Sequence, residues 1–229
     1  MDRRTRTVDD LLRLLDGLFT DTDAARWDEF YADRSRPVPF FAVKPDENLV
    51  SYLERGLIKP GRALDVGCGP GRNTIHLAAA GFTVDAVDLS ENAIAWARDR
   101  AAEAGMTVDF HRGDAFAATG PYDLIHDSGC FHHLPPHRRI SYLAMLDRAL
   151  VPGGHFALTC FTAEEGSSRT DADFYRDTKL DGGVGYTPES LRWIFSDLVE
   201  VELRPMREQH ADSASFGVPF LCTALFRRP

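Results

Sequence analysis

The sequence lacks three features: long apolar runs, closely spaced cysteines and an excess of basic residues. No apolar run approaches the ~18 residues that a membrane-spanning helix needs, and the charged start of the chain carries no apolar leader segment. Lysine and arginine total 26 against 35 acidic residues, a formal charge of −9, which disfavours a DNA or bulk RNA partner. We therefore expect a cytoplasmic protein that binds neither nucleic acid nor a membrane.

The few cysteines of the chain are widely separated. No pair follows the Cys-x-x-Cys spacing of metal sites, and no other metal-ligand spacing is present. The cysteines are Cys68, Cys130, Cys160 and Cys222. We therefore expect free thiols in a reducing compartment and no bound metal.

What the sequence does contain is a glycine-rich turn between an apolar segment and a helix-forming segment. Residues 62–66 predict a buried strand, and residues 75–80 have helix-forming composition. Glycines at 67, 69 and 71 lie between them, where a tight turn needs positive φ or a close approach of backbone to ligand. The dinucleotide fingerprint Gly-x-Gly-x-x-Gly is not met, because position 72 is arginine. A nicotinamide-dependent dehydrogenase is therefore disfavoured.

An acidic residue ends the second predicted strand. Residues 83–88 alternate in polarity and finish at Asp88. A carboxylate at the tip of this strand can accept hydrogen bonds from both hydroxyls of a ribose. Together with the glycine turn, Asp88 predicts a site for an adenosine-type ligand that carries no pyrophosphate.

With these motifs in this order, the sequence resembles the class I S-adenosylmethionine-dependent methyltransferases. The matching segments are 65–71 for the glycine loop, 88–90 for the ribose acid, 113–115 for the adenine-side turn, 122–125 for the fourth strand and 150–154 for the turn before the fifth. The resemblance covers about residues 60–162. It implies an α/β, Rossmann-like fold with a seven-stranded sheet of order 3-2-1-4-5-7-6, the last strand antiparallel, and helices on both faces. It also implies S-adenosyl-L-methionine as cofactor and S-adenosyl-L-homocysteine as product.

The same resemblance assigns the cofactor-binding residues. Asp88 would hold the ribose, Asp114 would accept from the adenine amino group, and Phe116 would flank the adenine ring. The full set is Asp65, Gly67, Cys68, Gly69, Gly71, Asn73, Asp88, Leu89, Asp114, Ala115, Phe116 and Asp127.

The first 45 residues match the family pattern poorly. We expect them to form a helical and aromatic N-terminal cap, residues 1–45, on a methyltransferase domain at residues 46–229. Residues 8–19 have helical apolar spacing, which predicts either a packing helix or a lid. The aromatic cluster at 27–41 either plugs one end of the core or forms a wall that receives a flat or apolar substrate. On the second hypothesis the substrate contacts are Trp27, Tyr31, Phe40 and Phe41.

The segment after the fourth strand is the candidate methyl-transfer site, because ligands of an open parallel sheet bind outside the carboxyl ends of its strands. Its candidate catalytic residues are His132, His133 and Asp127. One histidine could act as a general base, or could only support the loop. Cys130 in this segment and Tyr186, at the end of an irregular stretch at 163–186, are further candidate substrate contacts.

The sequence thus predicts a methyltransferase that acts on a small-molecule acceptor by in-line displacement, as a monomer or homodimer. Methyl transfer from a sulfonium depends mainly on positioning and on exclusion of water, so no catalytic group is demanded. Two alternatives stay open: a cofactor-binding protein without turnover, and a methyltransferase that acts on a macromolecule.

Overall fold

One seven-stranded sheet organises the molecule, of which the computed structural model describes residues 5–19, 24–180 and 182–229. The strands are β1 (Arg62–Val66), β2 (Thr83–Asp88), β3 (Asp109–Arg112), β4 (Tyr122–Ser128), β5 (Leu150–Phe161), β6 (Val199–Pro205) and β7 (Leu221–Arg227). Their order is β3-β2-β1-β4-β5-β7-β6. β7 runs antiparallel to both of its neighbours, and the remaining pairs are parallel. The predicted Rossmann-like sheet is confirmed.

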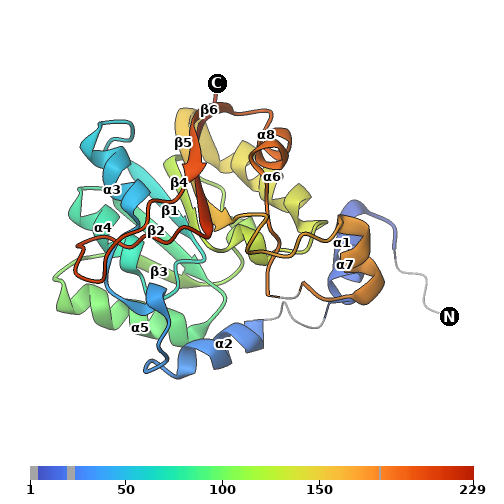
Figure 1. The fold of residues 1–229 in the computed structure, drawn as a ribbon, viewed down its shortest axis with the longest axis horizontal. Coiled ribbons are helices and arrows are strands. Elements are labelled where there is room, and N and C mark those ends of the chain that lie inside the picture. The colour runs from blue at the N-terminus through green and yellow to red at the C-terminus, as the bar shows by residue number, and fades with distance from the viewer. Residues whose placement is uncertain (1–4, 20–23, 181) are drawn as a thin grey trace.

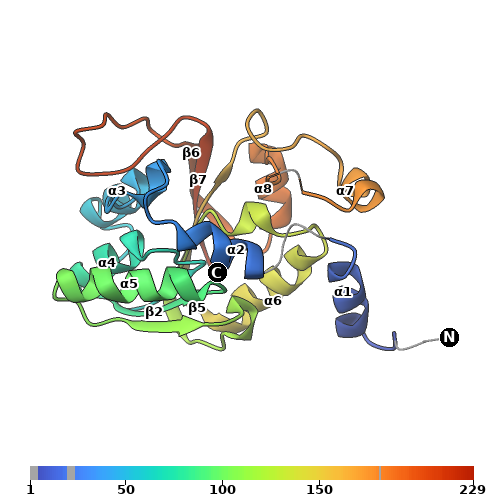
Figure 2. The same ribbon diagram turned by 90° about the horizontal axis from the view of Figure 1, so that it is seen from below.

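Helices cover both faces of this sheet (Figure 1). The α-helices are α1 (Val8–Asp16), α2 (Ala24–Ala32), α3 (Glu47–Glu54), α4 (Arg72–Ala79), α5 (Glu91–Glu103), α6 (Arg138–Ala149), α7 (Asp171–Asp177) and α8 (Pro188–Ile194). Short 3-10 helices lie at η1 (Pro39–Phe41), η2 (Ala115–Ala117) and η3 (Phe131–His133). Both views place α3, α4 and α5 toward one end of the molecule and α1 and α7 toward the other (Figures 1 and 2).

The alternation of side chains along β1 explains how two faces are buried at once. Ala63 packs in a cluster with α3 and α4, whereas Leu64, one residue later, packs in a cluster with α6 and α8. Successive side chains of a strand point to opposite faces, so a strand buried on both sides reads as a continuous apolar run. This is why residues 62–66 were readable as a strand from sequence.

The loop between β1 and α4 depends on glycine. Gly67 has φ of 63° and Gly69 has φ of 51°, a region that residues with a Cβ rarely adopt. A Cβ built at Gly67 would lie 2.8 Å from the Cβ of Cys130, so the loop after β4 packs directly on the glycine turn. The carboxyl ends of β1 and β4 are therefore held close together at this point.

The N-terminal segment docks on the sheet domain at two places. On α2, Asp28 Oδ1 accepts from Ser90 Oγ and from the Asn92 amide, both at 2.9 Å, and so fixes α2 against the start of α5. At the end of α1, Asp16 Oδ1 accepts from His137 Nε2 at 2.9 Å and from Arg138 Nε at 2.8 Å. The division into a cap at 1–45 and a domain at 46–229 stays a prediction.

The stretch at 163–186, expected to be irregular, contains a helix. α7 begins after Thr170, whose hydroxyl accepts from the Asp173 amide while the Asp173 side chain accepts from the Thr170 amide. This reciprocal cap starts a helix of only seven residues inside a stretch rich in Gly, Ser and Asp, whose composition hides it.

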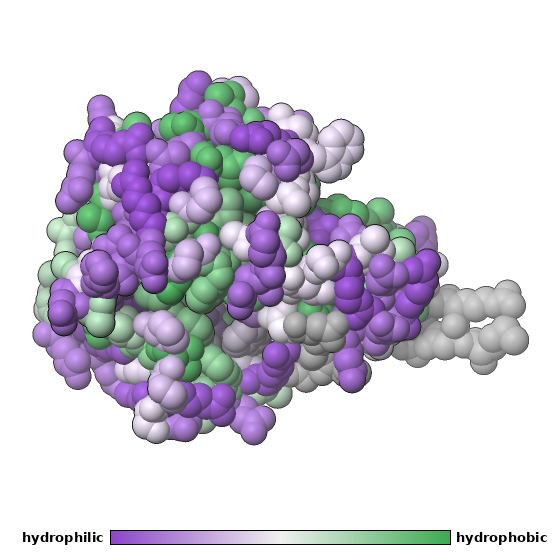
Figure 3. Space-filling model, in the orientation of Figure 1, coloured by the Kyte–Doolittle hydropathy of each residue, from purple (hydrophilic) through white to green (hydrophobic). Residues whose placement is uncertain are grey.

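On the face shown in Figure 3, apolar residues gather along the middle and charged residues occupy the flanks. Within the described ranges, no helix combines the length and the hydropathy that crossing a membrane requires.

Candidate functional site

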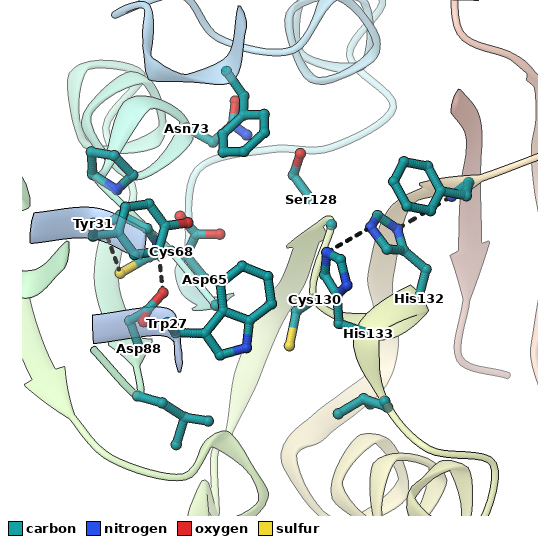
Figure 4. Close-up of a pocket in the computed structure, with 18 of the residues that line it drawn as sticks. Trp27, Tyr31, Asp65, Cys68, Asn73, Asp88, Ser128, Cys130, His132 and His133 are labelled. Carbon is teal, nitrogen blue, oxygen red and sulfur yellow. Dashed lines mark hydrogen bonds between the residues drawn. The ribbon is translucent and has the colours of Figure 1, made fainter. Parts of the chain in front are cut away.

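A cavity of about 650 Å³ opens at the carboxyl ends of β1, β2 and β4. Its predicted members come from all the motifs singled out in the sequence and are Trp27, Tyr31, Phe40, Asp65, Gly67, Cys68, Gly69, Asn73, Asp88, Leu89, Asp114, Phe116, Cys130, His132 and His133. In Figure 4, Asp65 and Asp88 lie on one side of this cavity and the two histidines on the other, with Trp27 drawn between them.

Asp88, the last residue of β2, is a buried carboxylate at the base of the cavity. Its Oδ2 accepts from the Gly69 amide at 2.9 Å, and its Oδ1 accepts from the Ser90 amide at 2.8 Å. Burial raises its pKa, although the backbone amides of Ser90 and Gly69 act in the opposite direction. A carboxylate oxygen can accept more than one hydrogen bond, so both oxygens keep capacity for a ligand.

Asp65 on β1 is held by two buried groups. Its Oδ1 lies 2.7 Å from Nδ1 of His126 on the adjacent strand β4, and its Oδ2 accepts from Thr74 Oγ1 of α4. Burial opposes the charged imidazole, but Asp65 outweighs it and raises the pKa of His126. The carboxylate of Asp65 is therefore fixed in orientation where it lines the cavity.

The segment after β3 forms another side of the cavity. Asp114 accepts from the Phe116 amide at 2.8 Å and caps the short helix η2. Phe116 lines the cavity and lies 5.8 Å from the guanidinium carbon of Arg138. Ala115, between the two, packs against the main core instead of lining the cavity.

Asp127 does not line the cavity, and its expected catalytic and cofactor-binding roles stay predictions. Its side chain is fully buried, Oδ1 accepts from the amides of Cys130 and Phe131, and Oδ2 accepts from Tyr142 Oη at 2.8 Å. Burial raises its pKa to about 6, although these three donors act in the opposite direction. The carboxylate therefore holds the backbone of the loop after β4 in place through these hydrogen bonds.

His132 and His133 lie in contact with each other at the far side of the cavity. Their Nε2 atoms are 3.1 Å apart, and His132 Nδ1 accepts from the Phe161 amide at 3.2 Å. The His132 ring stacks on Phe161 at 3.8 Å between centroids, and the His133 ring meets Trp27 at 4.7 Å. Burial lowers the pKa of His132 well below its usual range and that of His133 to about 4.

The predicted aromatic wall is split by the structure. Trp27, Tyr31 and Phe40 line the cavity, and the Tyr31 hydroxyl oxygen would lie 3.0 Å from a Cβ at Gly69. Phe41 instead packs behind the wall, 4.9 Å from Trp96 between ring centroids.

Two other predicted residues also lie outside the cavity. Tyr186 is buried against Phe131 and accepts from Arg139 Nε at 3.1 Å. Gly71 faces Ala97 of α5. Neither residue lines the cavity, and both assignments stay predictions.

Known proteins resemble this chain in sequence and in structure. A family model for a methyltransferase domain matches residues 63–154. The 2-heptyl-1-hydroxyquinolin-4(1H)-one methyltransferase of Mycobacteroides abscessus is 34% identical over 132 residues, which cover 56% of this chain and 57% of that protein. The chain spans about half the length of the curated relatives that it matches.

Solved structures share the whole fold. One, described for the conversion of a disulfide bond into a thioacetal group during echinomycin biosynthesis, has a TM-score of 0.69 and 25% identity, covering 90% of this chain and 93% of that one. The magnesium protoporphyrin IX methyltransferase of Synechocystis, with bound S-adenosylmethionine, has a TM-score of 0.62 and 18% identity over 100% of both chains. The chain therefore matches a methyltransferase domain over residues 63–154 and has the fold of structures solved with S-adenosylmethionine or S-adenosylhomocysteine bound.

Several residues that line the cavity were not singled out as site residues from the sequence. They are Asp16, Pro39, Pro70, Arg72, Ser128, Gly129, Leu134, Pro135, Arg138, Phe161, Glu165, Phe216, Phe220 and Leu221. Pro70 and Arg72 lie in or next to the glycine turn, and Ser128 and Gly129 lie at the end of β4 and directly after it, so these four had a local signal. The aromatic residues from 161 onward are scattered through the chain and meet only through the fold.

A group of possible metal ligands lies outside the cavity. Asp85, Asp109 and His111 bring one ligand atom each within 4.8 Å of one another on β2 and β3. Asp85 already accepts from Arg62 Nη2 at 2.8 Å and from Tyr122 Oη at 2.7 Å. The expectation that the protein binds no metal stays a prediction.

Proposed function

We propose that the protein is an S-adenosylmethionine-dependent methyltransferase that acts on a small-molecule acceptor. The observation that carries this proposal is the buried carboxylate of Asp88 beside the glycine turn, at the end of β2 and at the base of the cavity. A ribose with two free hydroxyls fits such a carboxylate, and the positive φ angles of Gly67 and Gly69 let a ligand approach the backbone.

The other residues of this half of the cavity fit the same cofactor. Leu89 and Phe116 offer apolar faces for adenine, and Asp114 offers a carboxylate for its amino group. Asp65 and Asn73 remain for the polar end of the methionine moiety. When bound, the cofactor supplies a methyl group activated by a sulfonium.

The opposite half of the cavity supports a small, largely apolar acceptor. Trp27, Phe40, Phe161, Phe216 and Phe220 surround it and would exclude water from the reacting atoms. The relatives support this class, since their names give a hydroxyquinolone, a porphyrin and a didemethyltoxoflavin as acceptors. We infer that His132 and His133 help to position the acceptor and that proximity in a dry pocket carries the catalysis.

Calorimetry with S-adenosylmethionine and S-adenosylhomocysteine tests the cofactor assignment, with Asp88→Ala as the variant. Two charge-assisted hydrogen bonds at about 1.5–3 kcal/mol each imply a loss of affinity of about a hundredfold or more. Asp109→Ala is the matched control, because Asp109 is exposed on the neighbouring strand and lies outside the cavity. Affinity of Asp88→Ala within about threefold of the unaltered protein would refute the assignment.

A further inference from the structure

The direction of one hydrogen bond fixes the protons of the whole histidine pair. A backbone N–H only donates, so His132 Nδ1, 3.2 Å from the Phe161 amide, must be the acceptor and carries no proton. The neutral ring then has its proton on Nε2, which points at His133 Nε2, 3.1 Å away. His133 Nε2 is therefore an acceptor whose lone pair is already used.

The remaining contacts of His133 leave it without a free basic nitrogen. Its ring also hydrogen-bonds the backbone of Gly182. Burial and the charge of Arg26 lower its pKa to about 4, and burial together with His133 lowers that of His132 further. The pair is a neutral, internally satisfied unit over the physiological range, and it does not take a proton from a substrate.

Most of the other titratable groups that line the cavity are neutral or engaged with protein groups. Burial raises the pKa of Tyr31, Cys68 and Cys130, which therefore stay neutral. Asp16 is tied to His137 and Arg138.

The carboxylates of the cofactor half are engaged as well. Asp65, Asp88 and Asp114 each accept hydrogen bonds from neighbouring protein groups. Glu165, at the rim, is the remaining carboxylate; its side chain has no hydrogen-bond or ion-pair partner among residues that the structure describes.

The lining of the cavity favours positive charge. Apart from Asp16, four carboxylates line it, against the two guanidinium groups of Arg72 and Arg138. Each guanidinium is neutralised by its own partner, Asp46 for Arg72 and Asp16 for Arg138. The acceptor half adds aromatic faces, which attract cations.

We propose that the acceptor is a neutral molecule attacked through a lone pair that is already free at neutral pH, a sulfur or an aromatic ring nitrogen, and that its methylated product is a cation held by the aromatic wall and Glu165. The proposal rests on the proposed function. The lone pair forms the new bond to the methyl carbon, the bond from that carbon to the cofactor sulfur breaks with its electrons going to sulfur, and the positive charge passes to the acceptor. No proton leaves, so no base is needed.

Nitrogen-15 NMR of the complex with S-adenosylhomocysteine tests the premise. The expected spectrum shows His132 with its proton on Nε2 and His133 with its proton on Nδ1, both neutral from pH 5.5 to pH 9. The variants His132→Gln and His133→Gln assign the signals. A ring that titrates between pH 6 and pH 8, or a His133 with a free Nε2, would overturn the proposal because a base would then be present.

A binding comparison tests the charge preference with N-methylquinolinium and its neutral isostere 1-methylnaphthalene. In the presence of saturating S-adenosylhomocysteine, we expect the cation to bind at least tenfold more tightly. Glu165→Gln should reduce that ratio severalfold, whereas Glu164→Gln, an exposed neighbour outside the cavity, should leave it unchanged. A ratio near one, or binding of neither probe, would overturn the proposal.

Failure of this inference is distinguishable from failure of the proposed function. If calorimetry shows no binding of S-adenosylhomocysteine, the methyltransferase assignment itself fails. If the cofactor binds and the cation is not preferred, only the neutral-acceptor proposal fails. If the cation is preferred, thioanisole and quinoline as acceptors, with labelled S-adenosylmethionine, separate a sulfur acceptor from a ring-nitrogen acceptor.

Discussion

Gly69 combines a positive φ of 51° with a close neighbour, the Tyr31 hydroxyl. Gly69→Ala should cost about 1–2 kcal/mol for the left-handed backbone, with an additional cost for displacing Tyr31. Gly56→Ala separates the two effects, because Gly56 has φ of 66° and nothing within 4 Å of its built Cβ. Urea unfolding should show a larger loss for Gly69→Ala than for Gly56→Ala.

The excess should shrink when the hydroxyl is removed. In a double-mutant cycle with Tyr31→Phe, the two changes should be less than additive, since Phe lacks the atom nearest the new Cβ. Strictly additive losses would mean that Gly69 is required by its backbone angle alone.

The buried carboxyl of Asp127 predicts a pH-dependent stability. Burial raises its pKa to about 6 in the folded protein, above the ~3.9 of an unfolded chain. The folded state therefore holds this proton more tightly, and the stabilisation present at pH 4 is lost as pH rises through 6. Two pKa units correspond to about 3 kcal/mol.

Asp127→Asn keeps the shape of the side chain and cannot titrate. The difference in unfolding free energy between the variant and the unaltered protein, measured in urea from pH 4 to pH 8, should grow in favour of asparagine as pH rises. A difference that stays constant over this range would show that Asp127 does not titrate in the folded protein.

Among single residues, the sequence identified those whose position in a motif determines their surroundings. Asp88 ends its strand and Gly67 lies in its turn, and both line the cavity. The roles of His132 and Asp127 could not be read in the same way. They depend on the Phe161 amide and the Tyr142 hydroxyl, which lie 29 and 15 residues away in the chain.

Helix α1 depends on one carboxylate for its attachment. Asp16 accepts from His137 and Arg138, and both Asp16 and Arg138 line the cavity. Asp16→Asn should loosen α1 and increase hydrogen exchange of its amides by about tenfold, which corresponds to about 1.4 kcal/mol. Asp9→Asn, on the exposed part of the same helix, is the control. Unchanged exchange in Asp16→Asn would show that apolar packing around Phe19 is enough to hold α1.

Elements with strong local signals were predictable, and short capped ones were not. Residues 62–66 and 83–88 were expected as strands and are β1 and β2. α7 was missed because its start depends on the Thr170–Asp173 cap and not on an apolar period. α1 was expected, but its spacing could not say that its end reaches Arg138, which lies over Phe116.

For the whole molecule, the contacts of residues 24–45 indicate more than a cover for the acceptor. Tyr31 and Phe41 pack with Trp96 of α5, and Asp28 fixes the start of that helix beside Asp88, the proposed ribose-binding residue. A chain that begins at residue 46 should therefore lose both stability and cofactor affinity, whereas one that begins at residue 24 should keep most of its affinity. Thermal unfolding and calorimetry of both chains measure this. Unaltered cofactor affinity in the shorter chain would restore the view of residues 1–45 as a lid for the acceptor alone.

The resemblance carried by the order of the motifs implied the overall topology, and the observed strand order agrees with it. The composition of the acceptor half did not follow. Phe161, Phe216 and Phe220 are held together by the antiparallel pairing of β5 with β7 and by the bridge between Asp46 and Phe216, contacts that no local pattern encodes.

That distribution of the lining residues has a consequence for engineering. Residues 63–154, the stretch shared with the family, supply Asp65, Asp88 and Asp114, whereas Trp27, Phe40, Phe161, Glu165, Phe216 and Phe220 come from segments on either side. Mutant libraries confined to 27–40, 161–165 and 216–221 would vary the acceptor half of the cavity while leaving residues 63–154 unchanged. The stretch matched by the family model would thus stay constant while the segments on either side of it are varied.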